Sequence, residues 1–251
     1  MTHWPAPEGL PALGADEIHV WMASLEDLAP FSAALGAFQD HAERERGARF
    51  HFEADRVRHA ITRGVLRRLA GHYLDRPPAE LRFGAGAYGK PHLSGADAGR
   101  LSFNVSHSGN VVLIALAHHA NVGVDIESWA SRIDGPGIDR IADSAFSAHE
   151  RVALHALAPG ERRAAFFAIW SRKEAYIKAT GLGVSAGLHH FDVSHDPGDA
   201  RLLADRTRGA GPVEWVLHDL APASGYSAAL ATDDVTLRVL MFRASAAMLA
   251  P

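Results

Sequence analysis

The chain of 251 residues contains no cysteine. Without a thiol it forms no disulfide, no thiolate zinc site and no iron–sulfur cluster, and it has no cysteine nucleophile. A chain of this length buries a sizeable core without such staples. The lack of cysteine also suits a reducing compartment, and we expect a cytoplasmic protein.

Long apolar segments and an excess of positive charge are missing as well. The longest apolar run, Val111–Ala117, has the length of a strand, so we expect no membrane-spanning helix and no membrane partner. The N-terminal residues show no basic segment followed by an apolar one, so we expect no secretory signal. The formal net charge is −4, which gives no general positive field, so we expect no nucleic-acid partner.

Histidine, by contrast, is abundant, with 16 residues that include the pairs His118-His119 and His189-His190. The HExxH pattern of many zinc enzymes does not occur in the sequence. Adjacent histidines without ligand spacing are typical of partly exposed structural residues, and we expect no histidine metal site.

The first part of the chain combines one strand pattern with helical patterns. Residues 18–22 alternate loosely and predict a strand, whereas the alanine-rich residues 27–48 predict helix. Residues 55–74 have an apolar stripe surrounded by arginines, which predicts an amphipathic helix that a following proline pair ends. The glycine-rich residues 84–99 have no periodicity, and we expect a loop there.

The remainder of the chain predicts short strands and two further helices. Ser147–Glu150 matches a capping box that opens a helix, and a second helix is expected over 162–180, ended by Gly181. Residues 130–142 are expected to form a loop. The strand-like segments are 101–105, 111–117, 123–127, 191–193, 213–217, 226–231 and 235–242. This order predicts an α+β fold in two halves of similar plan, with a break near residue 122.

Three short patterns imitate known catalytic motifs. Residues 84–89 read GxGxxG, but Pro91 follows at once and no helical pattern comes after it, so we expect no dinucleotide site. Residues 183–187 read GxSxG, but they follow a helix and precede a strand, the reverse of a nucleophile elbow. Ser106 and His107 are neighbours on an expected strand, so their side chains point to opposite faces and do not form a nucleophile–base pair.

Two carboxylates, Asp125 and Glu127, are two residues apart on an expected strand and therefore project from one face. One or two carboxylates, with phosphate oxygens and water, are a typical binding set for Mg²⁺. A solvated strand face explains the pair equally well, and the pair alone does not decide between the two.

The expected helix over 162–180 favours a functional site. Trp170, Glu174 and Lys178 are spaced i, i+4, i+8 and share one face, with Lys173 at its border. Aromatic residues just upstream give this face a buried base. The alternative is a surface ion pair between Glu174 and Lys178, which contributes only a few tenths of a kcal/mol.

Several segments together resemble the Sfp-type 4′-phosphopantetheinyl transferase family. The matching segments are GVDIE (123–127), FFAIWSRKEAYIKATGLG (166–183), FNVSHS (103–108), YGKP (88–91) and the arginine-rich stretch 49–67. They occur in the family's order over about residues 45–195. The combination of GVDIE with WxxKEAxxKA is specific, whereas either motif alone would be less so.

The resemblance implies two pseudo-symmetric α+β halves, each a small, mostly antiparallel sheet packed with helices, with coenzyme A between them. We expect the N-terminal half over 1–122 and the C-terminal half, with the metal and catalytic motifs, over 123–251. The implied reaction is Mg²⁺-dependent transfer of the 4′-phosphopantetheine arm to a serine of an apo acyl or peptidyl carrier protein. The other product is 3′,5′-ADP, and we expect a monomeric enzyme.

The resemblance also implies roles for individual positions. Those matching metal ligands are Asp125, Glu127 and Glu174. Those matching catalytic residues are Asp125, Glu174 as the candidate base, and Lys178 beside the pyrophosphate. Those expected to contact coenzyme A are Arg58, Arg63, Lys90, Ser106, His107, Lys173 and Lys178.

The roles of the arginines in the helix expected over 55–74 are predicted from the family match and from their neighbours in the sequence. Both Arg58 and Arg63 match positions that bind the 3′-phosphate in some family members, so that choice stays open. Neither has a carboxylate at i+4, so we expect their charges to be free for a ligand. We expect Arg67 and Arg68 to be exposed and to serve solubility.

The chemistry agrees with the resemblance, because attack on a pyrophosphate develops charge that a metal ion and a lysine neutralise. The attacking hydroxyl comes from the partner, so the enzyme needs a base but no nucleophile of its own. Two alternatives stay open. One is a metal-dependent pyrophosphohydrolase of coenzyme A or a nucleotide, and the other is a noncatalytic module that binds coenzyme or carrier.

Overall fold

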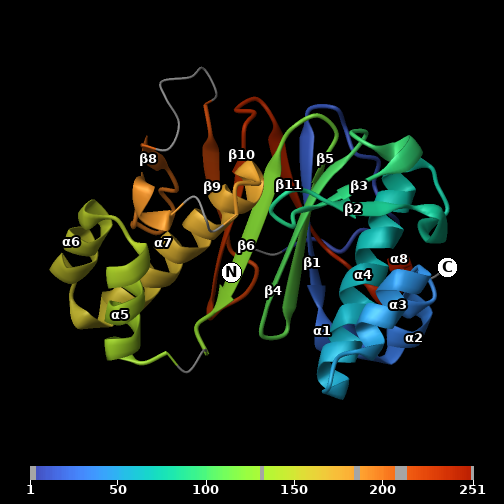
Figure 1. Cartoon of the computed structure of the whole chain (residues 1–251), viewed down its shortest axis with the longest axis horizontal. Coiled ribbons are helices and arrows are strands. Elements are labelled where there is room, and N and C mark those ends of the chain that lie inside the picture. The colour runs from blue at the N-terminus through green and yellow to red at the C-terminus, as the bar shows by residue number, and fades with distance from the viewer. Residues whose placement is uncertain (1–3, 131–132, 184–186, 207–213, 250–251) are drawn as a thin grey trace.

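Two β-sheets stand side by side in the middle of the molecule, with helices on both outer sides (Figure 1). The computed structural model describes residues 4–130, 133–183, 187–206 and 214–249. Within these ranges no helix is both long and apolar enough to cross a bilayer. The architecture is the predicted α+β fold.

The first sheet has four strands and the second has three. In spatial order, the first contains β11 (Arg238–Arg243), β1 (Glu17–Ser24), β5 (Val111–Ala117) and β4 (Ser102–Ser108). The second contains β6 (Val122–Ser128), β10 (Tyr226–Thr232) and β9 (Val216–Leu220). All neighbouring strands are antiparallel except β1 and β11, which are parallel. The separate hairpins are β2 (Phe83–Ala85) with β3 (Pro91–Leu93), and β7 (Phe191–Val193) with β8 (Leu202–Asp205).

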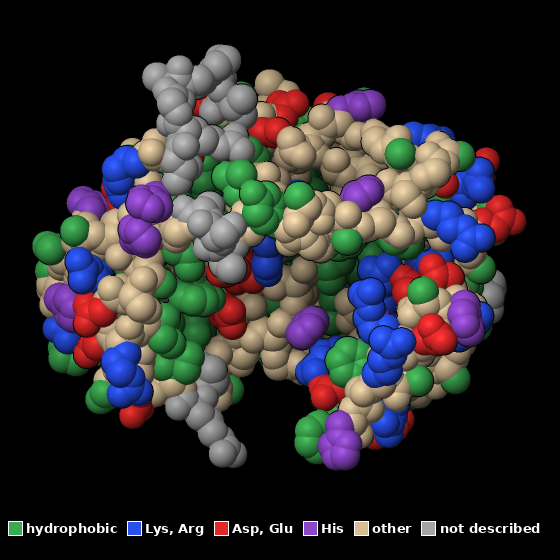
Figure 2. All heavy atoms as spheres, viewed as in Figure 1, with side chains coloured by type: hydrophobic (Ala, Val, Ile, Leu, Met, Phe, Trp, Pro, Cys, Tyr) green, Lys and Arg blue, Asp and Glu red, His purple; other side chains and the backbone are tan. Residues whose placement is uncertain are grey.

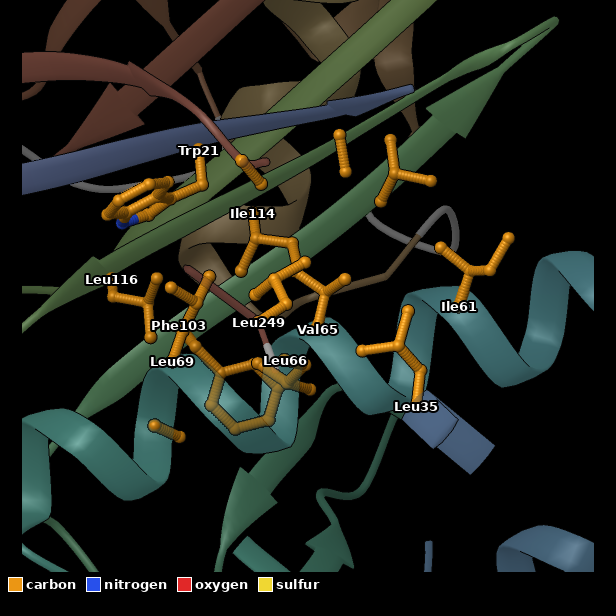
Figure 3. Packing of buried hydrophobic residues seen from close by; sticks show 14 of the residues in the cluster. Trp21, Leu35, Ile61, Val65, Leu66, Leu69, Phe103, Ile114, Leu116 and Leu249 are labelled. Carbon is orange, nitrogen blue, oxygen red and sulfur yellow. The ribbon is translucent and has the colours of Figure 1, made fainter. Parts of the chain in front are cut away.

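The first sheet packs on the 22-residue helix α4 (Glu53–Leu74). Figure 3 shows Val65, Leu66 and Leu69 of α4 pointing at the sheet, where Trp21 and Ile114 meet them. All five side chains are fully buried, and each such burial contributes roughly 1.5–3 kcal/mol. The smaller helices of this half are α1 (Leu25–Leu28), α2 (Ser32–Gly36), α3 (His41–Ala48) and α8 (Ala246–Leu249).

The second sheet packs on another 22-residue helix, α7 (Pro159–Thr180), with α5 (Gly135–Ala145) and α6 (Ala148–Ala156) beyond it. Each half is therefore a small sheet with one long helix on its outer face. A third apolar cluster lies between the sheets, where Val20 and Leu113 meet Val124 and Leu230. This shared core fixes one sheet against the other, because interior packing leaves little freedom to slide.

The end of the chain returns to the first half. Strand β11 pairs along β1, and Met248 and Leu249 of α8 are buried in the same cluster as α4. The first half therefore also contains residues from far beyond residue 122. The division into 1–122 and 123–251 stays a prediction.

Several predicted elements are confirmed with shifted ends. The capping box at Ser147–Glu150 has both of its hydrogen bonds, and Gly181 closes α7 with a φ of +70°. The expected strand over 213–217 begins at Val216, and residue 213 lies outside the described residues. The alanine-rich residues 27–48 are largely helical as predicted, in three short helices and a 3₁₀ turn, and Pro30 lies in the turn between the first two helices.

Two loop predictions are wrong. Residues 84–99 contain strand β3 and the end of β2, which form a hairpin that has too few residues to show periodicity. Residues 135–145 form α5, capped by the Asp134 side chain and packed through Ile138 and Ala142 on the second core. Two glycines and a proline in its first turn hide this helix from a propensity argument, and tertiary packing outweighs them.

Candidate active site

The site begins where helix α7 lies on strand β6. Gly123 explains the closeness: a Cβ there would lie 2.1 Å from the Ala175 carbonyl oxygen and 2.3 Å from Ala179 N. Any larger residue would push the helix backbone away. This approach brings Glu174 and Lys178 of α7 beside Asp125 of β6.

These residues line a cavity of about 390 Å³ between the two halves. Its lining consists of Val105, Ser106, His107, Asp125, Glu127, Trp170, Glu174 and Lys178. Figure 2 shows this face hollowed between the halves, with acidic and basic side chains gathered near its middle. Three separate motifs of the sequence thus meet in one place.

Asp125 is the most buried charged group of the cavity, with 3% of its surface exposed. Its Oδ1 accepts hydrogen bonds from Lys178 Nζ at 2.6 Å and from Ser106 Oγ at 2.9 Å. Its Oδ2 is buried without a hydrogen-bond partner. Burial raises the pKa of Asp125, and Lys178 and Ser106 oppose that rise. A buried, unpartnered carboxylate oxygen is a position where a bound cation would be stabilised.

Glu127 and Glu174 complete the acidic side of the cavity. Burial and the charge of Asp125 raise the pKa of Glu127 to about 7, although Lys178, Ser108 and Trp170 lower it. Burial and Asp125 also raise the pKa of Glu174. In the described part of the chain no three histidine, aspartate or glutamate side chains form a complete ligand cluster. Two carboxylates with phosphate oxygens and water nevertheless suffice for Mg²⁺.

A second cavity, of about 340 Å³, shares Val105, Glu174 and Lys178 with the first. The two therefore form one cleft. Lys90 lines this part, and its Nζ donates to the Ala179 carbonyl at 2.9 Å and the Val122 carbonyl at 3.2 Å. Burial lowers the pKa of Lys90 to about 8, and Asp233 opposes that shift.

Of the two candidate arginines, Arg58 is the one whose charge reaches the cleft. The pKa of His107 is lowered by desolvation and by the charges of Arg58 and Lys178. Arg58 also forms an ion pair with Asp55, three residues before it. Arg63 is held by Glu43 and lies over the Phe83 ring at 4.6 Å. The expectation that both arginines are free of carboxylate partners is therefore wrong, because the pairs form at i−3 and through tertiary contact.

Arg67 is also placed differently from the expectation. It is fully buried and binds Asp40, Glu43 and the carbonyl groups of Pro78 and Leu81. The solubility role expected for Arg67 is wrong. This arginine joins α3, α4 and the following 3₁₀ turn, and the helix pattern alone does not show those partners.

The structure does not bring Lys173 to the cleft. Its ammonium group is fully buried in the second half and bonds to Glu150 Oε2 at 2.8 Å. It also donates to the carbonyl groups of Leu188 at 2.8 Å and Phe191 at 2.6 Å. These three contacts use all three donors of the ammonium group. This placement does not support the expected contact of Lys173 with coenzyme A. Lys173 is rotated by about a third of a helical turn from Glu174, so its side chain points away from the cleft.

Sequence reasoning missed Asn104 and Ser108, which flank Ser106 on the same face of β4. Asn104 Oδ1 accepts a hydrogen bond from Val124 N at 2.9 Å, and Ser108 Oγ accepts one from Ser128 N at 3.0 Å. The signal was the spacing of two in the FNVSHS segment, which places all three polar side chains on one face.

A cleft with three carboxylates on one side and lysines on the other, between two α+β halves, is typical of an enzyme that acts on a phosphate ester or anhydride. The family model described as the 4′-phosphopantetheinyl transferase superfamily matches residues 121–231. A second model, described as the N-terminal part of 4′-phosphopantetheinyl transferase, matches residues 20–119.

Similar proteins agree with the family models. The chain is 33% identical to the 4′-phosphopantetheinyl transferase HetI of Nostoc sp. over 232 residues, which are 92% of this chain and 93% of that protein. It is 32% identical to a phosphopantetheinyl transferase of Thraustochytrium sp. over 76% of this chain and 71% of that protein. It is 31% identical to the 4′-phosphopantetheinyl transferase Sfp of Bacillus subtilis over 62% of this chain and 66% of that protein. The chain belongs to the 4′-phosphopantetheinyl transferase superfamily, which confirms the resemblance seen in its motifs.

Proposed function

We propose that this chain transfers the 4′-phosphopantetheine arm of coenzyme A to a serine hydroxyl of an apo carrier protein. In the reaction, the serine oxygen bonds to the phosphorus that bears the pantetheine group. The bond from that phosphorus to the bridging oxygen breaks, and 3′,5′-ADP leaves. The observation that supports this best is the meeting of Asp125, Glu127, Glu174 and Lys178 in one cleft.

The carboxylates fit a divalent cation. Asp125 Oδ2 is buried and has no hydrogen-bond partner, and burial together with the charge of Asp125 raises the pKa values of Glu127 and Glu174. Asp125 and Glu127 would hold Mg²⁺, with Glu174 as a further ligand directly or through water. When bound, Mg²⁺ supplies positive charge against the pyrophosphate.

The other groups have separate roles. Glu174 is half-buried and has a raised pKa, so it is suited to accept the proton of the serine hydroxyl. Lys178 supplies positive charge where the leaving oxygen becomes negative. Lys90, Ser106 and His107 line the cleft and would contact coenzyme A, with Arg58 close to His107.

The test is intact mass spectrometry of purified apo carriers after incubation with the protein, coenzyme A and Mg²⁺. We expect a mass gain of one phosphopantetheine on the carrier, and none when Mg²⁺ is chelated. Asp125→Asn should abolish the gain, whereas Asp143→Asn, at a carboxylate that is 62% exposed outside the cleft, should leave it intact. Consumption of coenzyme A at the same rate without any carrier would instead show a pyrophosphohydrolase.

A further inference from the structure

The cleft is built on the free edge of strand β6. Within the described residues β6 pairs only with β10, and β4 pairs only with β5, so each strand has one unpaired edge. These two edges face one another, but no backbone hydrogen bond between them is found in this part of the chain. An unpaired edge leaves a row of backbone groups that need other partners.

Side chains satisfy several groups of the β6 edge. The amide of Val124 donates to Asn104 Oδ1, and that of Ser128 donates to Ser108 Oγ. Two carbonyl groups of β6 also have side-chain partners. Lys90 Nζ donates to the Val122 carbonyl, and Lys178 Nζ lies 3.4 Å from the Val124 carbonyl.

Two of these partners, Asn104 and Ser108, have no role in the function proposed above. Asn104 is buried, and its bond to Val124 N fixes the residue directly before Asp125. Ser108 is half-buried and bridges two groups, because its Oγ accepts from Ser128 N and lies 3.4 Å from Glu127 Oε2. Together they hold the two ends of the stretch 124–128, and both carboxylates lie within this stretch.

We propose that Asn104 and Ser108 are positioning residues for the carboxylates of Asp125 and Glu127. They fix β6 against β4. They thereby also fix the distance between the two carboxylates, which belong to the second half, and His107, which belongs to the first. Ser106, between them, bonds directly to Asp125. This inference rests on the cation site of the proposed function, but not on transfer to a carrier, because cation binding is measured without one.

Ser108 offers the sharper test, since Asn104 is buried and its replacement could unfold the protein. Ser108→Ala removes both bonds, and Ser108→Thr keeps the hydroxyl. Ser102→Ala is the matched control, because Ser102 lies on the same face of β4 and makes no hydrogen bond to β6 among the described residues. The probe is Mn²⁺ alone, with binding to the protein measured from the electron paramagnetic resonance signal of the free ion.

We expect Ser108→Ala to weaken Mn²⁺ binding about tenfold, as the loss of a partner that orients a metal-binding carboxylate typically does. Transfer at limiting Mg²⁺ should fall by a similar factor, with an unchanged KM for coenzyme A. Ser108→Thr should restore Mn²⁺ binding, and Ser102→Ala should not change it. The proposal is overturned if Ser108→Ala binds Mn²⁺ like the unaltered protein, or if Ser108→Thr binds it as weakly as Ser108→Ala. Failure of the unaltered protein to modify any carrier would contradict the proposed function alone, because Mn²⁺ binding is measured without a carrier.

Discussion

Lys178 Nζ lies 2.6 Å from Asp125 Oδ1, although the two residues are 53 positions apart in the chain. The lysine comes from the long helix of the second half and the aspartate from the strand beneath it. Lys178 keeps 28% of its side chain exposed, whereas Asp125 keeps 4%. Lys178 therefore neutralises the buried Asp125 carboxylate from the solvent side. A pyrophosphate group that enters from that side would replace the carboxylate as the partner of Lys178.

Replacement of Asp125 tests the centre of the site. Asp125→Ala should lower turnover by at least about a thousandfold, because charge stabilisation in the cleft is lost. Its thermal midpoint should equal or exceed that of the unaltered protein, since burial makes the ionised Asp125 costly. Carrier modification and thermal unfolding measure the two effects. Full activity of this variant at low Mg²⁺ would contradict the assignment.

Glu174 is expected to act on turnover rather than on binding. Glu174→Gln keeps the shape but removes the base, so kcat should fall by about 10²–10⁴ while KM for coenzyme A changes little. Steady-state kinetics with a saturating apo carrier separates the two constants. If only the apparent affinity for coenzyme A changes, Glu174 is a binding residue and not the base.

The two arginines of α4 should respond differently to the 3′-phosphate. Arg58→Ala should weaken the binding of coenzyme A by about tenfold to a hundredfold, because a charge-assisted hydrogen bond contributes about 1.5–3 kcal/mol. The binding of dephospho-coenzyme A should change little. Arg63→Ala should keep the preference between the two coenzymes and lower stability, since it leaves Glu43 with one guanidinium partner fewer. KM values for both coenzymes and a urea titration distinguish these results. If Arg63→Ala alone removes the preference, the assignment is reversed.

Lys173 is expected to contribute to the free energy of unfolding rather than to coenzyme binding. Lys173→Met leaves Glu150 buried without its cation, which costs about 3–5 kcal/mol of unfolding free energy. The double variant with Glu150→Gln should recover part of this loss. Chemical denaturation gives the free energies, and KM for coenzyme A serves as the control that should not move. A selective rise in that KM without a loss of stability would restore the coenzyme contact predicted from sequence.

Cation binding should depend on pH through Glu127. Its pKa in the folded protein is raised to about 7, so at lower pH the carboxyl holds a proton that a cation must displace. Mg²⁺ affinity should therefore increase as pH rises from about 6 to 8, with proton release on binding below pH 7. Without a metal ion, the sign for stability is opposite: the raised pKa makes stability decrease as pH rises from 4.5 to about 7. Calorimetry in two buffers of different ionisation enthalpy measures the released protons, and Glu127→Gln should lower the number released, with Asp125 and Glu174 as the remaining sources.

Local patterns predicted the long elements of this chain well. The apolar stripe of α4, the capping box of α6 and the glycine that ends α7 are each visible in a few consecutive residues. Short-range physics sets such features, so a sequence shows them directly. Helix α5 was missed because its stability comes from packing on the second core rather than from its own residues.

The sequence by itself determined which chemistry is present: the strand carboxylates Asp125 and Glu127, the helical pair Glu174 and Lys178, and the absence of any thiol. The tertiary structure decided what each charge meets. Lys173, beside Glu174 in the chain, faces a buried glutamate, whereas Lys178 faces Asp125. Neighbours on a helix point in directions about 100° apart, so which one reaches the cleft depends on how α7 lies on β6. That placement is set by the contact at Gly123 and by the unpaired edges of two strands, which no local pattern contains.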